Sequence, residues 1–270
     1  MITFFRRFRQ RLLSENKFSK YILYAIGEII LVVIGILIAL QINNWNQSRL
    51  SEKLETKYYE RLLEDVREER GILQATLNYS NQVRFHAKNA ISVFENSEDM
   101  NPNPIDNLID MYQASQLHDP NSAASTYKEL IASGQINLIQ NDSFKTALIR
   151  YFEIDWDEST VFKLQNKYRE NLRGKMPDAI QSEIRSKCGD IYIKVRNGFE
   201  VALPKTCEIE ISNSIAQPVV EILKNDESLK RDLLFLIGNE KAKIGIMTST
   251  KGQLEDLIEQ LENIIKNETI

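Results

Sequence analysis

The strongest constraint on this chain is one uninterrupted apolar stretch near its N-terminus. Residues 22–42 read ILYAIGEIILVVIGILIALQI, and Glu28 is the only charged residue among them. As an α-helix, these 21 residues span about 30 Å, which matches the hydrocarbon thickness of a bilayer. A buried helix of a soluble protein is rarely this long and apolar on every side. The sequence therefore predicts a transmembrane helix over residues 21–43.

A cleaved signal peptide is the main alternative to a membrane-spanning helix. The apolar run is longer than the apolar region of a signal peptide, which has about 7–15 residues. Residues 40–46 read LQINNWN and contain no small-x-small cleavage pattern. An uncleaved signal anchor is therefore the better interpretation.

The distribution of charge around the stretch predicts its orientation. Residues 1–20 carry a net charge of +5, from four arginines and two lysines against Glu15. After the stretch, the first cation is Arg49. The positive-inside rule then places residues 1–20 in the cytoplasm, as a basic amphipathic segment. Residues 44–270 are expected to form a periplasmic domain of a bacterial inner-membrane protein.

Two further features of the N-terminal region are typical of a membrane surface. Tyr21 and Tyr24 precede most of the apolar stretch and Trp45 follows it, as in the aromatic belts of membrane proteins. Residues 2–13 read ITFFRRFRQRLL and mix apolar side chains with four arginines. This segment is either a short interfacial helix on the anionic leaflet or a set of cations that only sets the orientation. Both interpretations predict the same orientation.

Composition excludes several classes of protein. The net charge of the chain is −4, and without residues 1–20 and Glu28 a charge of −8 remains on the rest. Domains that bind nucleic acid are normally basic, so we expect no nucleic-acid partner. Two cysteines and two histidines are too few for a zinc cluster or a disulfide-rich scaffold.

Two stretches of the sequence are similar to a known family. Residues 4–46, FFRRFRQRLLSENKFSKYILYAIGEIILVVIGILIALQINNWN, resemble the signature of a bacterial family of single-pass membrane proteins. That family is known mainly from Bacteroidota and is catalogued only as a domain of unknown function. Residues 127–139, YKELIASGQINLI, resemble its later pattern of Tyr, Glu-Leu, Ser-Gly and Leu-Ile. The resemblance covers essentially the whole chain. It implies an inner-membrane protein with a periplasmic helical domain, and it implies no catalytic residues.

Beyond the apolar stretch the sequence predicts a mainly α-helical fold. No proline interrupts residues 45–100, and their apolar positions follow a helical period, which indicates one long amphipathic helix. A second long helix is predicted over residues 227–266. Neither can bury its apolar stripe alone, so we expect a long antiparallel helical stalk. Shorter helices over residues 104–117, 122–133 and 142–173 would form a distal helical head.

Residues 188–207 predict one small β-hairpin, inserted between helices. β-branched and aromatic residues flank Asn197-Gly198, a dipeptide typical of hairpin turns. Cys188 and Cys207 are each separated from this dipeptide by eight residues. In an oxidising periplasm we expect a disulfide across the open end of the hairpin, which would contribute about 3 kcal/mol to stability. Two buried free thiols are the alternative.

Three residues of the apolar stretch are candidates for a contact inside the membrane. Glu28, Gly35 and Ala39 share one face of the predicted helix, and Gly35-x-x-x-Ala39 would let another helix approach closely. A carboxylate in hydrocarbon is costly unless it is protonated, paired or able to reach the interface. Glu28 therefore indicates a polar contact to a partner helix, a protonated or snorkelling side chain, or a proton or ion path.

The sequence contains no motif for catalysis or for cofactor binding. It has no Gly-rich phosphate loop, no G-x-S-x-G and no H-E-x-x-H. The acidic cluster at residues 153–158 lacks the glycine and the closing glutamate of a calcium loop, so we expect a solvated surface there. His86 and His118 have no neighbours typical of metal ligands. We therefore expect no catalytic residue, no metal site and no cofactor.

These observations favour a membrane-anchored interaction or structural module of the bacterial cell envelope. Its expected partners are the lipid bilayer and, through the transmembrane helix, another membrane protein or a second copy of the chain. A periplasmic ligand-sensing domain is the alternative. It would need a separate membrane partner, because residues 1–20 leave no room for a cytoplasmic output domain. An uncharacterised envelope enzyme is the third possibility.

Overall fold

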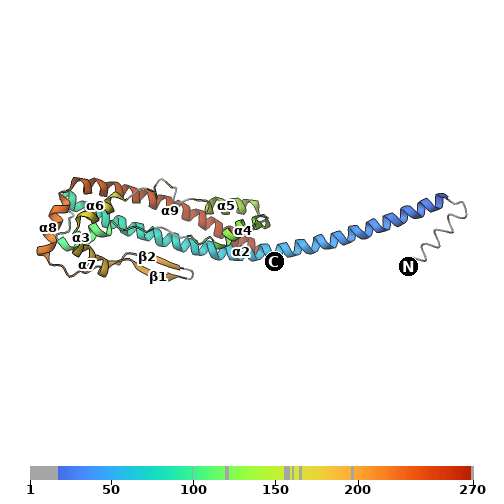
Figure 1. Cartoon of the computed structure of the whole chain (residues 1–270), viewed down its shortest axis with the longest axis horizontal. Helices are drawn as coiled ribbons and strands as arrows, with labels where there is room; N and C mark the ends of the chain where they lie inside the picture. The colour runs from blue at the N-terminus through green and yellow to red at the C-terminus, as the bar shows by residue number, and fades with distance from the viewer. Residues whose placement is uncertain are drawn as a thin grey trace. The chain divides into compact units, whose positions relative to one another are not determined.

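The computed structural model describes residues 18–98, 100–118, 122–154, 159, 161–163, 166–195 and 198–268 (Figure 1). It divides into two compact units, Met1–Lys57 and Tyr58–Ile270. The predicted interfacial segment at residues 2–13 lies outside the described residues, as do the side chains of Tyr21 and Tyr24 and residues 155–158 of the acidic cluster. The described chain is mainly α-helical with one small antiparallel two-stranded sheet, which confirms the predicted fold class.

Helix α2 (Phe18–Glu95) runs for 78 residues without a proline. Its end is set by Asn96, whose φ of 46° is left-handed, a conformation that often follows the last residue of a helix. The N–H of Ser97 donates to the carbonyl of Ser92 at 3.0 Å, and the N–H of Asn96 donates to that of Val93 at 3.3 Å. These bonds satisfy carbonyls that the helix end leaves open. The helix therefore ends before the predicted residue 100.

In the second unit, α9 (Glu227–Glu268) packs antiparallel to the C-terminal part of α2 (Figure 1). The order of their shared hydrophobic clusters shows the direction. Phe94, near the end of α2, clusters with Leu229 at the start of α9. Leu62 clusters instead with Leu261, near the end of α9. The apolar stripes of the two long helices thus cover each other, as the sequence predicts.

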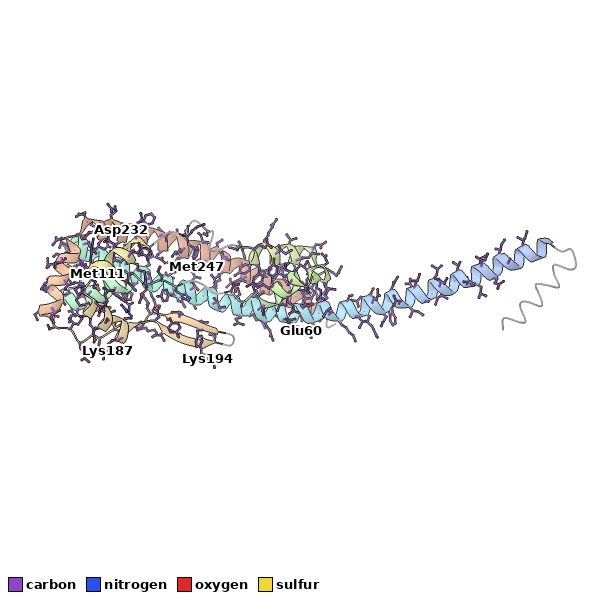
Figure 2. The ribbon with its side chains drawn as sticks, in the orientation of Figure 1. Glu60, Met111, Lys187, Lys194, Asp232 and Met247 are labelled. Atoms are coloured by element: carbon purple, nitrogen blue, oxygen red, sulfur yellow. A yellow bond between two sulfur atoms is a disulfide. The ribbon has the colours of Figure 1, made fainter. Side chains whose placement is uncertain are left out.

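The shorter helices are divided between two hydrophobic clusters at opposite ends of this helix pair. The cluster at the Glu95 end includes side chains of α3 (Pro104–Gln113), α6 (Lys167–Lys175), α7 (Asp178–Cys188) and α8 (Asn213–Lys224). The cluster at the other end includes side chains of α4 (Ser125–Ala132), the 3-10 helix η1 (Gln135–Leu138) and α5 (Asp142–Phe152). Figure 2 shows Met111 in the first cluster and Met247, on α9, in the second. The sequence placed all the shorter helices in one distal head, whereas α4, η1 and α5 cover the opposite end.

The single helix predicted over residues 142–173 is two helices in the structure. Helix α5 ends at Phe152 and α6 begins at Lys167, and the described residues between them are not helical. The Asn166 side chain accepts a hydrogen bond from the N–H of Arg169 at 2.9 Å and so caps α6. Tyr151 and Tyr168 are buried in different clusters, so the chain has to cross from one end of the helix pair to the other between them.

Other helix ends follow the signals in the sequence. Pro104 is the first residue of α3, and the Asn103 side chain accepts a hydrogen bond from the N–H of Ile105 at 3.1 Å. Gly134 follows α4 with a left-handed φ of 69°. Helix α3 is shorter than predicted and ends at Gln113. Helix α7, at Asp178–Cys188, was not predicted.

The hairpin consists of β1 (Ile191–Val195) and β2 (Gly198–Ala202) in antiparallel register. Val195 is paired with Gly198, so Gly198 belongs to β2 and not to the turn that the sequence predicts at Asn197-Gly198. Beyond β2, the Gln82 side chain on α2 donates to the carbonyl of Leu203 at 2.8 Å and accepts from its N–H at 3.0 Å. This reciprocal pair fastens the base of the hairpin to α2, in the way that a neighbouring strand would.

Two carboxylates on α2 hold the segment that leads into α4. Asp65 accepts hydrogen bonds from the N–H of Thr126 at 2.7 Å and from the Ser125 hydroxyl at 2.9 Å. Glu69, one turn later and only 5% exposed, accepts from the N–H of Ala123 and from the Tyr151 hydroxyl. Burial raises the pKa of Glu69 above its ordinary value, although these hydrogen bonds act in the opposite direction.

We expect wild-type protein to lose stability relative to Glu69→Gln as the pH rises through the pKa of Glu69. The folded state binds this proton more tightly than the unfolded state, because the folded pKa is raised. Glu69 therefore contributes most to the free energy of unfolding below the pKa that it has in the unfolded state. This contribution declines as the pH rises through the higher pKa of the folded state. Thermal unfolding measured by circular dichroism between pH values of about 4.5 and 7 would show it. Glu259→Gln, an exposed control on α9, should show no such trend, and an equal trend in both variants would contradict the prediction.

Candidate functional site

The described part of α2 contains one segment long and apolar enough to cross a membrane. Its most apolar window of 18 residues has a mean hydropathy of 2.6, and none of it is buried within the chain. Leu31 and Ile29 are 73% and 64% exposed. A soluble protein rarely leaves so continuous an apolar surface in contact with water. The length, composition and exposure of this segment fit a membrane anchor.

Glu28, Gly35 and Ala39 lie on this segment with exposed side chains or backbone. Their spacings of seven and four residues place them within about 20° of one helix face, as the sequence predicts. A Cβ atom added at Gly35 would meet no other heavy atom within 4 Å. The backbone at Gly35 is therefore open to close approach by another helix, and the contact itself stays a prediction.

A polar and aromatic border follows the apolar segment. Trp45 is exposed, and the Arg49 guanidinium lies 5.6 Å from its ring centroid. Arg49 also donates a hydrogen bond to the Asn46 side chain at 3.4 Å. An amphipathic indole next to a cation is suited to the interface between hydrocarbon and water.

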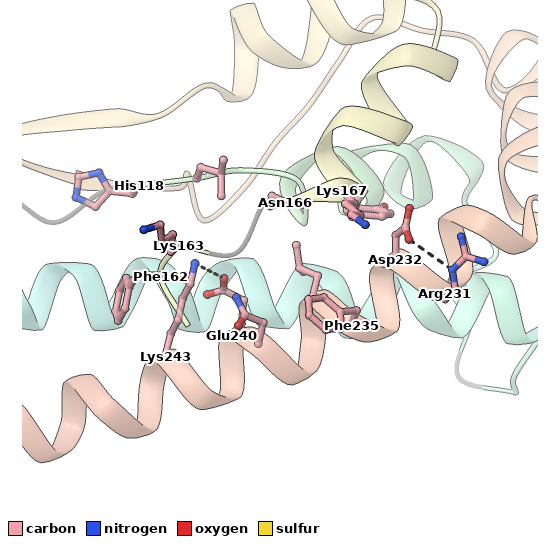
Figure 3. A pocket seen from close by; sticks show the side chains of 14 residues that line it. His118, Phe162, Lys163, Asn166, Lys167, Arg231, Asp232, Phe235, Glu240 and Lys243 are labelled. Carbon is pink, nitrogen blue, oxygen red and sulfur yellow. Dashed lines mark ion pairs between the residues drawn. The ribbon is translucent and has the colours of Figure 1, made fainter. Parts of the chain in front are cut away.

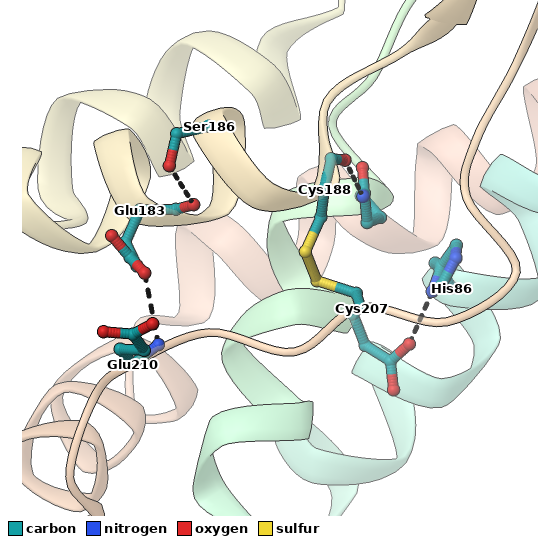
Figure 4. Close-up of a disulfide and its surroundings, with 8 residues drawn as sticks. His86, Glu183, Ser186, Cys188, Cys207 and Glu210 are labelled. Atoms are coloured by element: carbon teal, nitrogen blue, oxygen red, sulfur yellow. Dashed lines mark hydrogen bonds and ion pairs between the residues drawn. A yellow bond between two sulfur atoms is a disulfide. The ribbon is translucent and has the colours of Figure 1, made fainter.

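Cys188 and Cys207 are joined as a disulfide in the structure, with their Cα atoms 5.3 Å apart (Figure 4). Cys188 is the last residue of α7 and is fully buried, and its carbonyl accepts a hydrogen bond from the Gln113 side chain at 2.7 Å. Cys207 lies in the segment that follows the hairpin and packs against the same hydrophobic cluster. The disulfide therefore closes the loop that contains the hairpin at the point where this loop leaves the core.

The contacts around the disulfide join the returning segment to α7, and join α2 to α3 and to the residues before β1. The N–H of Glu210 donates to the Glu183 carboxylate on α7 at 3.2 Å. On the other side of the disulfide, His86 Nδ1 lies 2.6 Å from Asp110 Oδ1 of α3 (Figure 4). Tyr79 donates to Asp190, between α7 and β1, at 3.0 Å. The sequence pairs the two cysteines but shows none of these supporting contacts.

The second unit also contains a cavity of about 550 Å³, a volume typical of small-molecule sites (Figure 3). It lies beside α9 and the start of α6, and the segment after α3 contributes Leu117 and His118. Its apolar lining includes Phe235, which is 58% exposed, and Phe162. The sequence does not indicate this cavity, because its lining comes from three segments that are far apart in the chain.

Charged side chains of both signs line the cavity. Lys243 pairs with Glu240 at 3.1 Å and lies 5.6 Å from the Phe162 ring centroid. Arg231 lies 3.7 Å from Asp232, which also accepts a hydrogen bond from the Asn171 side chain. These pairs offset two of the four cations that line the cavity, and Lys163 and Lys167 are the other two. The aromatic side chains and the excess of cations suit a ligand with an apolar body and a negatively charged group.

The two histidines make local contacts rather than a metal site. His86 pairs with Asp110, and the His118 ring lies 5.4 Å from that of Tyr79. Of the predicted acidic cluster, the structure describes only Glu153 with its side chain. This carboxylate accepts a hydrogen bond from the Tyr127 hydroxyl at 3.2 Å. Within the described residues, no group of three or more His, Cys, Asp or Glu side chains could hold a metal ion.

Comparison with known proteins gives one match. A family model described as a family of unknown function (DUF6090) matches residues 28–172. The matched region begins at Glu28 in the apolar segment and ends within α6, so the hairpin, the disulfide and α9 lie beyond it. No curated protein and no solved structure matches the chain.

We expect the loss of the disulfide to destabilise the second unit. Its cysteines are 19 positions apart, and a loop of this size corresponds to about 3 kcal/mol of free energy of unfolding. Chemical unfolding should show this loss in the double variant Cys188→Ser and Cys207→Ser. Wild-type protein with the disulfide reduced should have the same free energy of unfolding as the double variant. Reaction of both cysteines with a thiol reagent in unfolded, unreduced wild type would contradict the disulfide.

Proposed function

The chain belongs to the DUF6090 family of unknown function, and we propose that it is a membrane-anchored interaction or structural module of the bacterial cell envelope. The observation that carries this proposal is the apolar segment of α2, none of whose most apolar window is buried within the chain. Hydrocarbon is the environment in which such a surface is stable, and a helix satisfies its own backbone hydrogen bonds there. The second unit has its own hydrophobic clusters and does not need the segment for its core.

We propose that the second unit lies in the periplasm. The net charge of +5 on residues 1–20 supports a cytoplasmic N-terminus, since cations are retained on that side. The disulfide supports the same orientation, because disulfides persist in the periplasm and are rare in the cytosol. Two independent properties of the chain, its charge distribution and its cysteine pair, thus favour one orientation.

A reporter fusion tests this orientation. An enzyme that is active only in the periplasm, fused after Ile270, should be active in a bacterial host. The same fusion to a reporter active only in the cytoplasm should be silent. The control is a variant in which the cations of residues 1–20 are replaced by glutamine, which should weaken the bias of the first fusion. Activity of the cytoplasmic reporter alone would overturn the proposed topology.

We propose further that the membrane helix contacts a partner helix through the face that contains Glu28, Gly35 and Ala39. A carboxylate in the membrane is best accommodated by a hydrogen-bonding partner, and Gly35 and Ala39 let that partner approach. The partner is a second copy of this chain or another membrane protein. This contact makes the helix an assembly element as well as an anchor.

Crosslinking of the full chain in native membranes tests the contact. We expect wild type to give one defined crosslinked species, and Glu28→Leu to lose most of it. Glu28→Gln should keep the species if a hydrogen bond without charge is enough. Ile29→Leu, a neighbouring apolar change, is the control and should have no effect. Monomer alone in every sample would contradict the contact.

The cavity favours a second candidate function, that of a ligand-sensing domain. It is large enough for a small molecule, and its aromatic side chains could pack against an apolar ligand. A sensor would be stabilised against thermal unfolding by its ligand, whereas a structural module would keep its partner with or without a small molecule. This difference separates the two functions experimentally.

A further inference from the structure

Three arginines lie near the end of α3, where two of them contact Tyr112 and the third binds Ser115 and Gln116. Arg169 and Arg173 come from α6, and Arg185 comes from α7. The Arg173 guanidinium carbon lies 4.5 Å from the centroid of the Tyr112 ring, and Arg185 Nε lies 3.4 Å from the Tyr112 hydroxyl oxygen. One aromatic side chain therefore contacts two guanidinium groups. We call Arg169, Arg173 and Arg185 the arginine cluster.

Two members of the arginine cluster share the same acceptors. Arg169 Nη1 and Arg173 Nη2 lie 3.3 Å and 2.9 Å from one oxygen, Oε1 of Gln116. Both arginines also donate to Ser115. Arg169 donates to the Ser115 carbonyl at 2.7 Å, and Arg173 donates to the Ser115 hydroxyl at 3.1 Å. These bonds hold two positive charges close together, where they repel each other.

The arginine cluster has no carboxylate partner among the described residues. None of its three members forms an ion pair there, although acidic residues outnumber basic ones in the chain, 38 to 34. Asp178 acts on Arg185 only from beyond ion-pair distance, and Asp190 is bound to Tyr79. Burial, together with the charges of Arg169 and Arg185, lowers the pKa of the Arg173 guanidinium.

Support of the α3 terminus explains only part of this arrangement. A helix C-terminus carries a partial charge of about −0.5, and a cation beside it is favourable. The Arg169 bond to the Ser115 carbonyl fits that role. Three full positive charges exceed this partial charge several-fold, so the cluster keeps a net positive charge. The exposed side chain of Arg185 and the half-buried side chains of Arg169 and Arg173 leave the cluster accessible to solvent.

We propose that Arg169, Arg173 and Arg185 form a binding site for a phosphate group. A guanidinium presents several N–H donors in a planar fork that matches phosphate oxygens, and such charge-assisted hydrogen bonds are strong. A phosphate monoester carries close to two negative charges on three terminal oxygens, which suits three cations better than a carboxylate does. The phosphate is either free or the headgroup of a lipid. The inference does not depend on the membrane topology proposed above.

Titration calorimetry on the full chain in non-ionic detergent tests the site. The first ligand is inorganic phosphate at constant ionic strength, and the second is a short-chain phosphatidic acid, with the matching phosphatidylcholine as its blank. Arg185→Gln is the test variant, because this exposed side chain makes few contacts and its loss should leave the fold intact. Lys187→Gln removes the same charge two residues later on α7 and is the control.

We expect saturable binding that Arg185→Gln weakens by roughly tenfold or more and Lys187→Gln by less than about twofold. Arg185→Lys should fall between wild type and Arg185→Gln, because it keeps the charge and loses the fork. Binding of inorganic phosphate would support a free phosphate, and binding of phosphatidic acid alone would support a lipid headgroup. Absence of binding by both ligands, or an equal loss in Arg185→Gln and Lys187→Gln, would overturn the site.

Discussion

The second unit depends on the packing of α9 against the C-terminal part of α2. Neither helix can bury its apolar stripe alone, and each supplies side chains to both hydrophobic clusters. The shorter helices then fill the space at each end of the pair. The surface pair between Arg67 and Glu262, at 2.6 Å, adds little energy because both side chains are half exposed. Burial of apolar surface is the term that holds the two helices together.

Hydrogen bonds from α2 side chains position the loops of the second unit. Asp65 and Glu69 fix the entry to α4, and Gln82 fixes the base of the hairpin. Each of these side chains is on α2 and binds backbone groups of a segment far along the chain. An unpaired backbone group near the core is costly, so one side chain is enough to hold a loop in place. Helix α2 therefore positions these loops and also supplies apolar side chains to both hydrophobic clusters.

The sequence predicts those features that local chemistry determines. The period of the apolar residues gives both long helices, and Asn103 with Pro104 gives the start of α3. The strand-forming residues around Gly198 predict the hairpin, although Gly198 itself lies in β2. The alternation of apolar residues does not reveal the break between α5 and α6. That break exists because Tyr151 and Tyr168 belong to different clusters, and this is a tertiary requirement.

The candidate sites are predictable to different extents. Glu28, Gly35 and Ala39 lie within one helix, so their common face follows from their spacing alone. The cavity and the arginine cluster combine segments that are distant in sequence. Arg173 and Arg185, for example, approach each other only because α6 and α7 both pack near the end of α3. No local pattern in the sequence signals such an approach.

The two separate hydrophobic clusters have a consequence for how the second unit opens. Cooperative unfolding follows continuous apolar contact, and here two contact regions share only the long helices. The disulfide lies in the cluster at the α7 end, so it restrains the unfolded chain at that end alone. Amide protons of α4 and α5 should therefore exchange with solvent through local openings that leave α7 and α8 folded. We therefore expect the unit to open as two subglobal folding units on one shared pair of helices.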